Sequence, residues 1–295
     1  MEYGNIKCKS KYKGGTDVDL NWLQSISYGI LSGLAEILPI SAQAHQILLM
    51  KFSGVKETSP LFDFLIHFGV FVALYYHSQA QLIRMNRARS LARIPKKKRK
   101  RPLDTRSLMD WSMLKTMCIP AIVGIFLFRY TAKWETNFLM IALFLFINGI
   151  ILYIPQFFPT GNRDSRTLSR IEGLLMGLGG TASALPGVSS IGATVSISSV
   201  CGVERDYGLT MALMMNLVLL LGRMVYDGMD IVNQGLGMLS LMMLLRYLLT
   251  MCASFLGTLL GIQILRRVGE HRGYYIFGIY CWGLALFIFI LNLLA

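Results

Sequence analysis

Two apolar segments of this chain, about 150 residues apart, each contain a proline among small polar residues. They span 32–45 and 183–194, with Pro39 and Pro186 inside them. Proline and glycine interrupt a helix, and a membrane tolerates this only where protein or trapped water satisfies the freed backbone groups. Polar side chains in hydrocarbon usually face a cavity or a partner. Two broken helices in matching halves of a chain indicate a binding site near the bilayer midplane.

Composition places the chain among polytopic membrane proteins. Of its 295 residues, 54% are hydrophobic and 15% are charged, against about 25% charged in a soluble domain. The five cysteines have no close spacing, so neither a disulfide framework nor a zinc site is expected. No small-residue cleavage site follows the first apolar run, so we expect no cleaved signal peptide.

The net charge of +13 is concentrated in one connection. Between Arg84 and Arg106 the chain has eleven basic residues against the single acid Asp104. Basic runs also occur in nuclear-import and nucleic-acid-binding segments. Because this run lies between two apolar segments, we interpret it as a cytoplasmic loop that obeys the positive-inside rule, with no nucleic-acid partner.

Eight segments are candidates for insertion, since a spanning helix needs roughly 20 mainly apolar residues. They are 22–50, 61–83, 111–131, 137–158, 171–201, 207–227, 238–265 and 273–294. Basic connections lie at 84–110, 163–170 and 266–272. Placing all three in the cytoplasm makes 171–201 a re-entrant hairpin.

Segment 22–50 has the same character as 171–201, which predicts an inverted repeat in an all-α polytopic membrane protein. After a polar tail at 1–21, each copy is a re-entrant helical hairpin followed by three transmembrane helices. The copies span 22–158 and 171–295, and an odd number of spans turns the second one upside down. The lysine-rich tail favours a cytoplasmic start, whereas a re-entrant first segment leaves the tail outside; we favour the repeat.

Three glycine pairs at four-residue spacing predict close helix packing. They are Gly29 and Gly33, Gly173 and Gly177, and Gly257 and Gly261. We expect these pairs to pack helices within one chain, and a homodimer is the alternative use of the same faces.

The first broken segment carries the acid–base candidates. Glu36 is its one acid, and a carboxylate there costs at least about 2.5–3.5 kcal/mol unless it is paired, solvated or coordinating. His45, beyond Pro39, is expected to face Glu36 across the turn; the alternative is an interfacial histidine at a helix end. His67 and His77 lie on an ordinary span, and we expect no function for them.

The second broken segment is similar to a phosphate-binding loop. Glycines let the backbone approach an anion, and hydroxyls with free N–H groups at a helix start bind it. The run is Pro186-Gly-Val-Ser-Ser-Ile-Gly-Ala-Thr194. A surface of small residues that packs helices is the alternative.

Together the two segments resemble the motifs of the undecaprenyl-diphosphatase (bacitracin-resistance) family of bacterial membrane enzymes. The first family motif has two glutamates four apart, Leu-Pro, a serine pair and Gly-His. The second is Pro-Gly-x-Ser-Arg-Ser-Gly-Ala-Thr. The matching residues are Glu36, Leu38, Pro39, Ser41, His45, Pro186, Gly187, Ser189, Gly192, Ala193 and Thr194. Other similarities extend over most of 22–294, and the family also implies the re-entrant hairpins and the inverted repeat.

Four positions depart from these motifs. Ser32 stands where the family has its first glutamate, and Ala42 replaces a serine. Ser190 replaces the arginine and Ile191 the following serine. In the family, two carboxylates and a divalent cation, Mg²⁺ or Ca²⁺, hold the diphosphate while the arginine neutralises it. Losing such an arginine costs about 10³–10⁵ in rate on the scale of arginine fingers.

Arg223 is a candidate for the missing positive charge. It lies within the apolar run 211–226, where an unpaired arginine is expensive. Our hypothesis is that it reaches the cavity. The alternative is a salt bridge to Asp227, four residues on along the same helix face.

The resemblance implies a multi-pass enzyme of the bacterial inner membrane that hydrolyses a polyprenyl (undecaprenyl) diphosphate to the monophosphate lipid carrier for cell-wall synthesis. Glu36 would be the metal ligand or water-orienting base, and His45 the acid/base or nucleophile. The implied phosphate-binding residues are Ser41, Gly187, Ser189, Ser190, Gly192 and Thr194. Two alternatives remain: a catalytically degraded paralogue that binds or translocates a lipid phosphate, and a transporter of an unrelated small anion.

Overall fold

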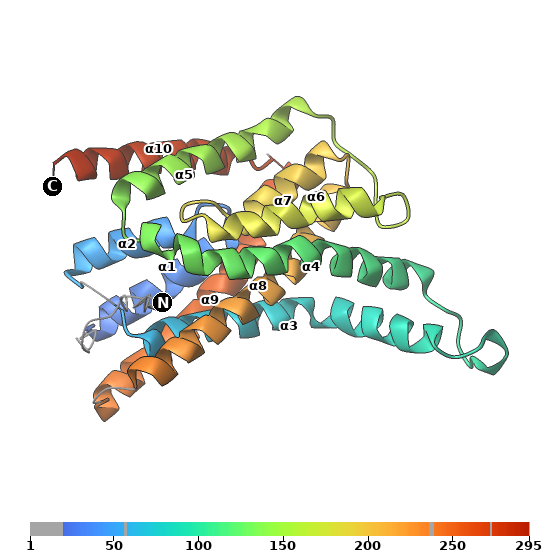
Figure 1. The fold of residues 1–295 in the computed structure, drawn as a ribbon, viewed down its shortest axis with the longest axis horizontal. Coiled ribbons are helices and arrows are strands. Elements are labelled where there is room, and N and C mark those ends of the chain that lie inside the picture. The colour runs from blue at the N-terminus through green and yellow to red at the C-terminus, as the bar shows by residue number, and fades with distance from the viewer. Residues whose placement is uncertain (1–19, 56–57, 236–238, 272, 295) are drawn as a thin grey trace, which may run out of the picture.

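The computed structural model describes residues 20–55, 58–235, 239–271 and 273–294, and these residues form an all-helical bundle (Figure 1). Its α-helices are α1 (Trp22–Ile37), α2 (Ala42–Ser53), α3 (Pro60–Ala92), α4 (Thr105–Thr131), α5 (Phe138–Tyr153), α6 (Arg170–Thr181), α7 (Ser190–Val200), α8 (Arg205–Gln234), α9 (Leu241–His271) and α10 (Tyr275–Leu293). Six of them, α3, α4, α5, α8, α9 and α10, are long and apolar enough to cross a membrane. The chain is therefore a polytopic membrane protein. Most of the predicted polar tail lies outside the described residues.

The first broken segment forms α1 and α2, separated at Pro39. Leu38 is extended, with φ −69° and ψ 143°, because a following proline disfavours the helical conformation. Ser41 then takes φ +67°, the one positive φ outside glycine among the described residues. From there its side chain caps α2 by accepting a hydrogen bond from the Ala44 N–H at 3.4 Å. The chain therefore stops one helix and starts another inside the bundle.

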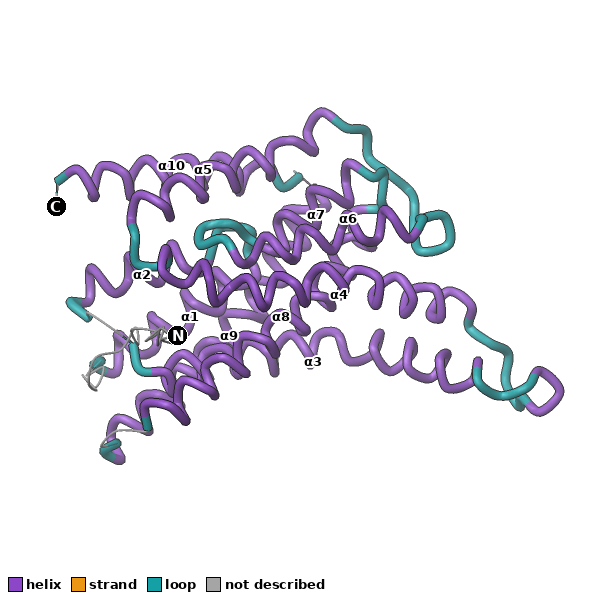
Figure 2. Tube along the Cα trace, viewed as in Figure 1, coloured by secondary structure: helices purple, strands orange, loops and turns teal. Residues whose placement is uncertain are grey.

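The second broken segment repeats this construction. Leu185 is extended before Pro186, and Gly187 takes φ +112° against α5, where a Cβ would lie 2.9 Å from the Ile141 carbonyl oxygen. Ser189 caps α7 by accepting from the Gly192 N–H at 3.2 Å. Figure 2 shows a loop inside the bundle beside α2 and α7, whereas most other loops lie at its two ends.

The basic connection is shorter than the predicted loop at 84–110. Helix α3 continues through Ala92 and α4 begins at Thr105. With 33 residues, α3 is about 50 Å long, well beyond a hydrocarbon core of about 30 Å. Hydropathy therefore predicted where the apolar stretch ends, while arginine, alanine and leucine, which are good helix formers, extend the helix past it.

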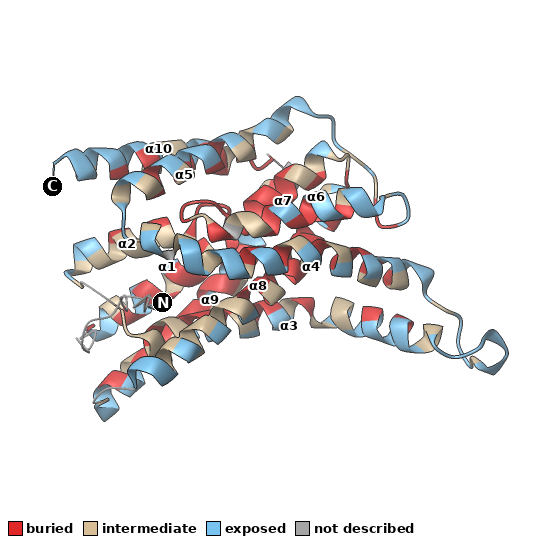
Figure 3. Ribbon diagram, in the orientation of Figure 1, coloured by how far each residue is buried: buried red, intermediate tan, exposed pale blue. Residues whose placement is uncertain are grey.

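The glycine pairs pack helices within the chain, which confirms that prediction. Gly29 and Gly33 of α1 lie against the α9 backbone near Thr250 and Ser254, and Gly257 of α9 lies against Ile30. Gly177 of α6 lies in the same way against α4 at Met117 and Pro120. The buried residues are concentrated where these seams meet α7 and α8, while the tips of α3 and α4 are exposed (Figure 3).

A salt bridge fixes the connection between α5 and α6. Arg163 donates to both carboxylate oxygens of Glu172, at 2.5 and 3.0 Å, and to the carbonyl oxygen of Cys201. Ser169 caps α6 and donates its N–H to Glu172. The hydrogen bond from Arg163, followed by that from the Ser169 N–H, lowers the pKa of Glu172 to about 2.

We expect this pair to give the protein an acid-dependent stability. A lowered carboxyl pKa stabilises the folded state above the unfolded pKa, about 4.3, and the stabilisation is lost as the pH falls toward the folded value. Melting temperatures measured between pH 7 and pH 3 should fall in the wild type below about pH 4.5. Glu172→Gln should lack that component of the fall; equal slopes in both proteins would contradict the assignment.

Candidate functional site

A small polar pocket lies where the two helix breaks meet. It has a volume of about 20 Å³, which is room for roughly one water molecule. Its lining comes from α1, the start of α2, the start of α7 and the middle of α8. The polar members are Glu36, Ser41, Gln43, Ser189, Ser190, Asn216 and Arg223. The structure thus brings four predicted site residues together with Arg223.

Asn148 of α5 joins the two breaks. Its side-chain amide donates to the carbonyl oxygen of Pro39 and accepts from the N–H of Ser189, both at 3.0 Å. Asn148 is fully buried, so each bond satisfies a backbone group that has no access to water. Sequence analysis missed this residue; a lone amide within an apolar span was the available signal.

Both short helices begin at the pocket. Ala42 and Gln43 open α2, and Ser190 opens α7, and all three line it. A helix N-terminus presents free N–H groups and partial positive charge. The capping hydroxyls of Ser41 and Ser189 accept backbone bonds, which leaves each O–H free to donate. Two such N-termini in one pocket favour an anion.

Two opposite charges also line the pocket. Glu36 enters from α1 and Arg223 from α8. Among the described residues no ion pair joins Arg223 to Asp227, the alternative partner; Arg223 lies over the ring of Phe128, at 4.7 Å from its centroid. Asp227 instead accepts a hydrogen bond from His67. The geometry therefore agrees with the hypothesis that Arg223 serves the cavity.

Asn216 is a second polar residue that sequence analysis missed. It is buried in α8, and its side-chain oxygen accepts a hydrogen bond from Ser190 at 3.0 Å. Its Nδ2 has no hydrogen-bond partner in the described part of the chain. Because Asn216 lines the pocket, this amide is a further donor available to an anion.

Other predicted site residues lie apart from the pocket lining. The two ring nitrogens of His45 bond the Ser41 carbonyl oxygen and the Tyr280 hydroxyl, each at 2.8 Å, so this ring faces α10 rather than Glu36. Thr194 is buried against Gly179 of α6. Gly187 and Gly192 lie against α5 and Pro39, where a Cβ would meet protein atoms. The positions of Gly187, Gly192 and Thr194 therefore agree with the alternative interpretation, a surface of small residues that packs helices.

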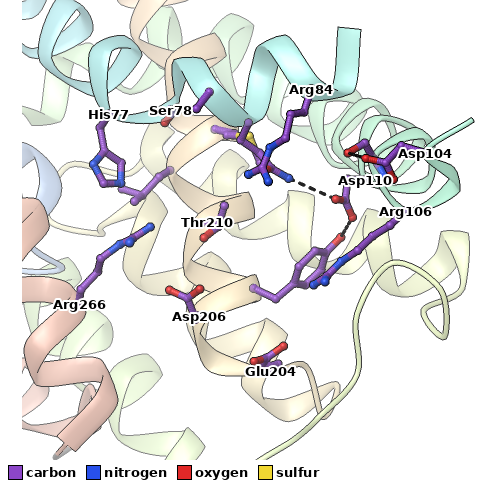
Figure 4. A pocket seen from close by; sticks show the side chains of 16 residues that line it. His77, Ser78, Arg84, Asp104, Arg106, Asp110, Glu204, Asp206, Thr210 and Arg266 are labelled. Atoms are coloured by element: carbon purple, nitrogen blue, oxygen red, sulfur yellow. Dashed lines mark hydrogen bonds between the residues drawn. The ribbon is translucent and has the colours of Figure 1, made fainter. Parts of the chain in front are cut away.

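A larger cavity, about 440 Å³, lies between α3, α4, α8 and α9 toward the basic end (Figure 4). His77, Arg84, Arg106 and Arg266 line it, but so do Asp104, Asp110, Glu204 and Asp206. Asp110 accepts hydrogen bonds from Ser165, Tyr207 and Gln81. The four carboxylates offset the cations, so this cavity carries no net positive charge.

The fold and the pocket define a class: a multi-pass membrane protein with a polar pocket where two broken helices meet. Residues 25–287 match the model of the bacitracin resistance protein BacA family. The chain belongs to that family.

Relatives along nearly the whole chain agree with this assignment. The chain is 29% identical to an undecaprenyl-diphosphatase of Methanobrevibacter smithii, covering 90% of this chain and 96% of the relative. It is 26% identical to undecaprenyl-diphosphatase 1 of Shouchella clausii, over 92% and 96%. It is 24% identical to an undecaprenyl-diphosphatase of Desulforapulum autotrophicum, over 89% and 95%.

Replacing Asn148 should destabilise the protein. Asn148→Leu leaves the Ser189 N–H buried without a partner, at about 1–3 kcal/mol, and leaves the Pro39 carbonyl oxygen with only the weak Cys281 thiol contact at 3.6 Å. We expect a clearly lower melting temperature in detergent. Asn86→Leu, an exposed position on the extension of α3, is the control; equal melting temperatures would show that the bridge carries no stability.

Arg223→Gln should weaken anion binding. Removing one charged donor from the pocket should raise the Kd for methylenediphosphonate, a non-hydrolysable diphosphate, about tenfold or more. Isothermal titration in detergent measures it. Arg129→Gln, an exposed arginine on α4, is the matched control. An unchanged Kd for Arg223→Gln would exclude Arg223 from the site.

Proposed function

We propose that this protein hydrolyses a polyprenyl diphosphate, in the manner that the names of its relatives describe. The products are inorganic phosphate and the monophosphate lipid that carries cell-wall precursors. The supporting observation is the convergence of two helix N-termini, Arg223 and Glu36 on one pocket inside a membrane protein of this family. The apolar surroundings suit a substrate whose head group is anionic and whose tail stays in lipid.

In this proposal the pocket residues have distinct roles in phosphoryl transfer. Hydroxyls of Ser41 and Ser189 and the N–H groups that begin α2 and α7 bind phosphate oxygens. Arg223 neutralises charge that grows on those oxygens in the transition state. The arginine that the family has at the position of Ser190 is thereby replaced by one from α8, while Asn216 adds an amide donor.

Water is the nucleophile in this proposal, since Ala42 occupies the position of a family serine. Glu36 accepts a hydrogen bond from the water and takes its proton as the oxygen attacks the terminal phosphorus. The bond from phosphorus to the bridging oxygen breaks, and the bridging oxygen leaves with the lipid monophosphate. The diphosphate is larger than the pocket of about 20 Å³, so binding must widen it.

The donor set fits a magnesium ion that arrives with substrate. Among the described residues no group of three or more His, Cys, Asp or Glu side chains is placed to hold a metal. Mg²⁺ is usually bound through one or two carboxylates plus substrate phosphates, whereas Ca²⁺ takes 6–8 oxygen ligands. Glu36, with the Ser41 hydroxyl, would hold it. When bound, the cation supplies further neutralisation of the diphosphate.

His45 acts in this proposal by positioning. Its ring bonds the carbonyl oxygen of Ser41 and stacks on Tyr280, with centroids 5.8 Å apart. These contacts hold Ser41 in its positive-φ conformation, from which it caps α2. Loss of His45 would therefore disturb the phosphate-binding end of α2 without removing a group from the pocket.

We also propose that the fold is the predicted inverted repeat. Helices α1–α5 correspond in order to α6–α10, with α1–α2 and α6–α7 as re-entrant hairpins. Contacts between helices support the correspondence: α1 packs on α9 as α6 packs on α4, and α3 packs on α9 as α8 packs on α4. Two helices also pack on their own counterparts, α3 on α8 and α5 on α10.

The basic connections support the orientation. The α3–α4 and α5–α6 connections lie at the same end of the bundle, and the C-terminus lies at the other (Figure 1). The end of α9 lies at the same end of the bundle as these two connections, because Arg205 at the start of α8 donates to the Gly269 carbonyl oxygen. That end is cytoplasmic by the positive-inside rule, which puts the start of α1 outside.

Glu36→Gln should abolish hydrolysis. We expect purified protein to release phosphate from undecaprenyl diphosphate in the presence of Mg²⁺, and the variant to lose about 100-fold or more. EDTA should also suppress release. The control is Glu204→Gln, which replaces an exposed carboxylate in the lining of the larger cavity.

A wild type that binds diphosphate without hydrolysing it would favour the second candidate function. If the wild type released no phosphate yet bound methylenediphosphonate, the protein would be the paralogue that binds or translocates lipid phosphate.

A further inference from the structure

A histidine and an aspartate pair across α3 and α8, outside the lining of the small pocket. His67 of α3 and Asp227 of α8 lie 2.7 Å apart, from Nδ1 to a carboxylate oxygen. His67 is only 8% exposed. Buried ionisable groups in a membrane protein are expensive and usually functional. Sequence analysis expected no function for His67, and the proposed chemistry does not use it.

This pair is the one polar contact of the His67 ring among the described residues. The other ring nitrogen, Nε2, is buried and has no hydrogen-bond partner there. His67 therefore donates through Nδ1 to Asp227 and is held by nothing else polar. Asp227, Arg223 and Glu36 are the charged groups close enough to act electrostatically on His67, so both charges of the pocket lie within electrostatic range of the pair.

Asp227 has a second partner within reach. Arg223 lies one turn earlier on α8, and residues four apart on a helix are neighbours that form ion pairs. In a poorly solvated setting such a pair is strongly attractive. Yet no ion pair joins Arg223 and Asp227 in the described part of the chain, and Arg223 lines the pocket instead. The Asp227 carboxylate is hydrogen-bonded to His67.

We propose that His67 is a positioning residue that keeps Asp227 away from Arg223 and so leaves the guanidinium free for the diphosphate. Two donors on different helices, His67 on α3 and Arg223 on α8, compete for the one carboxylate of Asp227. When His67 holds Asp227, Arg223 faces the pocket with Phe128 beneath it. Without His67, Asp227 turns to Arg223 and neutralises the charge that recognises the substrate.

This inference deepens the proposed function by naming what sets the affinity of its site for a diphosphate. It does not require hydrolysis to occur, because it concerns only where Arg223 points. Binding of methylenediphosphonate tests it, and phosphate release tests the proposed function. A failure of one is therefore distinguishable from a failure of the other.

The experiment is a double-mutant cycle on the purified full-length chain in detergent. His67→Leu should raise the Kd for methylenediphosphonate about tenfold, the effect of cancelling one charged donor. Asp227→Asn alone should leave the Kd near the wild-type value, because Arg223 stays free. The double variant His67→Leu/Asp227→Asn should restore binding, since the competing carboxylate is gone.

Rescue separates positioning from a merely structural role. If His67 only stabilised the packing of α3 on α8, removing Asp227 as well would not restore affinity. His77→Leu, a histidine ten residues further along α3, is the matched control and should bind like the wild type. A Kd for His67→Leu equal to wild type, or a double variant as weak as His67→Leu, would overturn the proposal.

Discussion

Every interrupted helix in a membrane leaves backbone N–H and C=O groups that hydrocarbon cannot satisfy, and this chain has two such interruptions side by side at one pocket. One side chain satisfies a backbone group at each interruption, since Asn148 donates to the Pro39 carbonyl oxygen and accepts from the Ser189 N–H. Because the two bonds share one amide, the start of α2 and the start of α7 are held at a fixed separation. The pocket between them is a consequence of that bond pair.

The pocket obtains its positive character mostly from backbone. Partial charges at two helix N-termini cost little to bury because they belong to hydrogen-bonded helices. One full positive charge, on Arg223, is then set against one carboxylate, on Glu36. Such a balance tolerates burial in a membrane better than a cluster of arginines and still favours an incoming dianion or trianion.

Sequence patterns predicted the two broken segments because proline, glycine and small polar residues are local signals. Glu36, Ser41, Ser189 and Ser190 could be placed at one site for the same reason. Asn148, Asn216 and His67 could not, since each acts through a partner far away in sequence. Arg223 shows the limit most directly: spacing along one helix offers Asp227 as its partner, and only the position of α3 reveals that His67 holds that carboxylate.

The glycine seams of the bundle also determine which parts of it can move together. At Gly29 and Gly33 the backbones of α1 and α9 touch without intervening side chains, and Gly177 brings α6 onto α4 in the same way. Such seams resist sliding and rolling, because any displacement forces backbone atoms into one another. Helix α1 is thereby held closely to α9, and α6 to α4. We therefore expect the α1–α9 pair and the α4–α6 pair each to move as one rigid unit when the pocket widens.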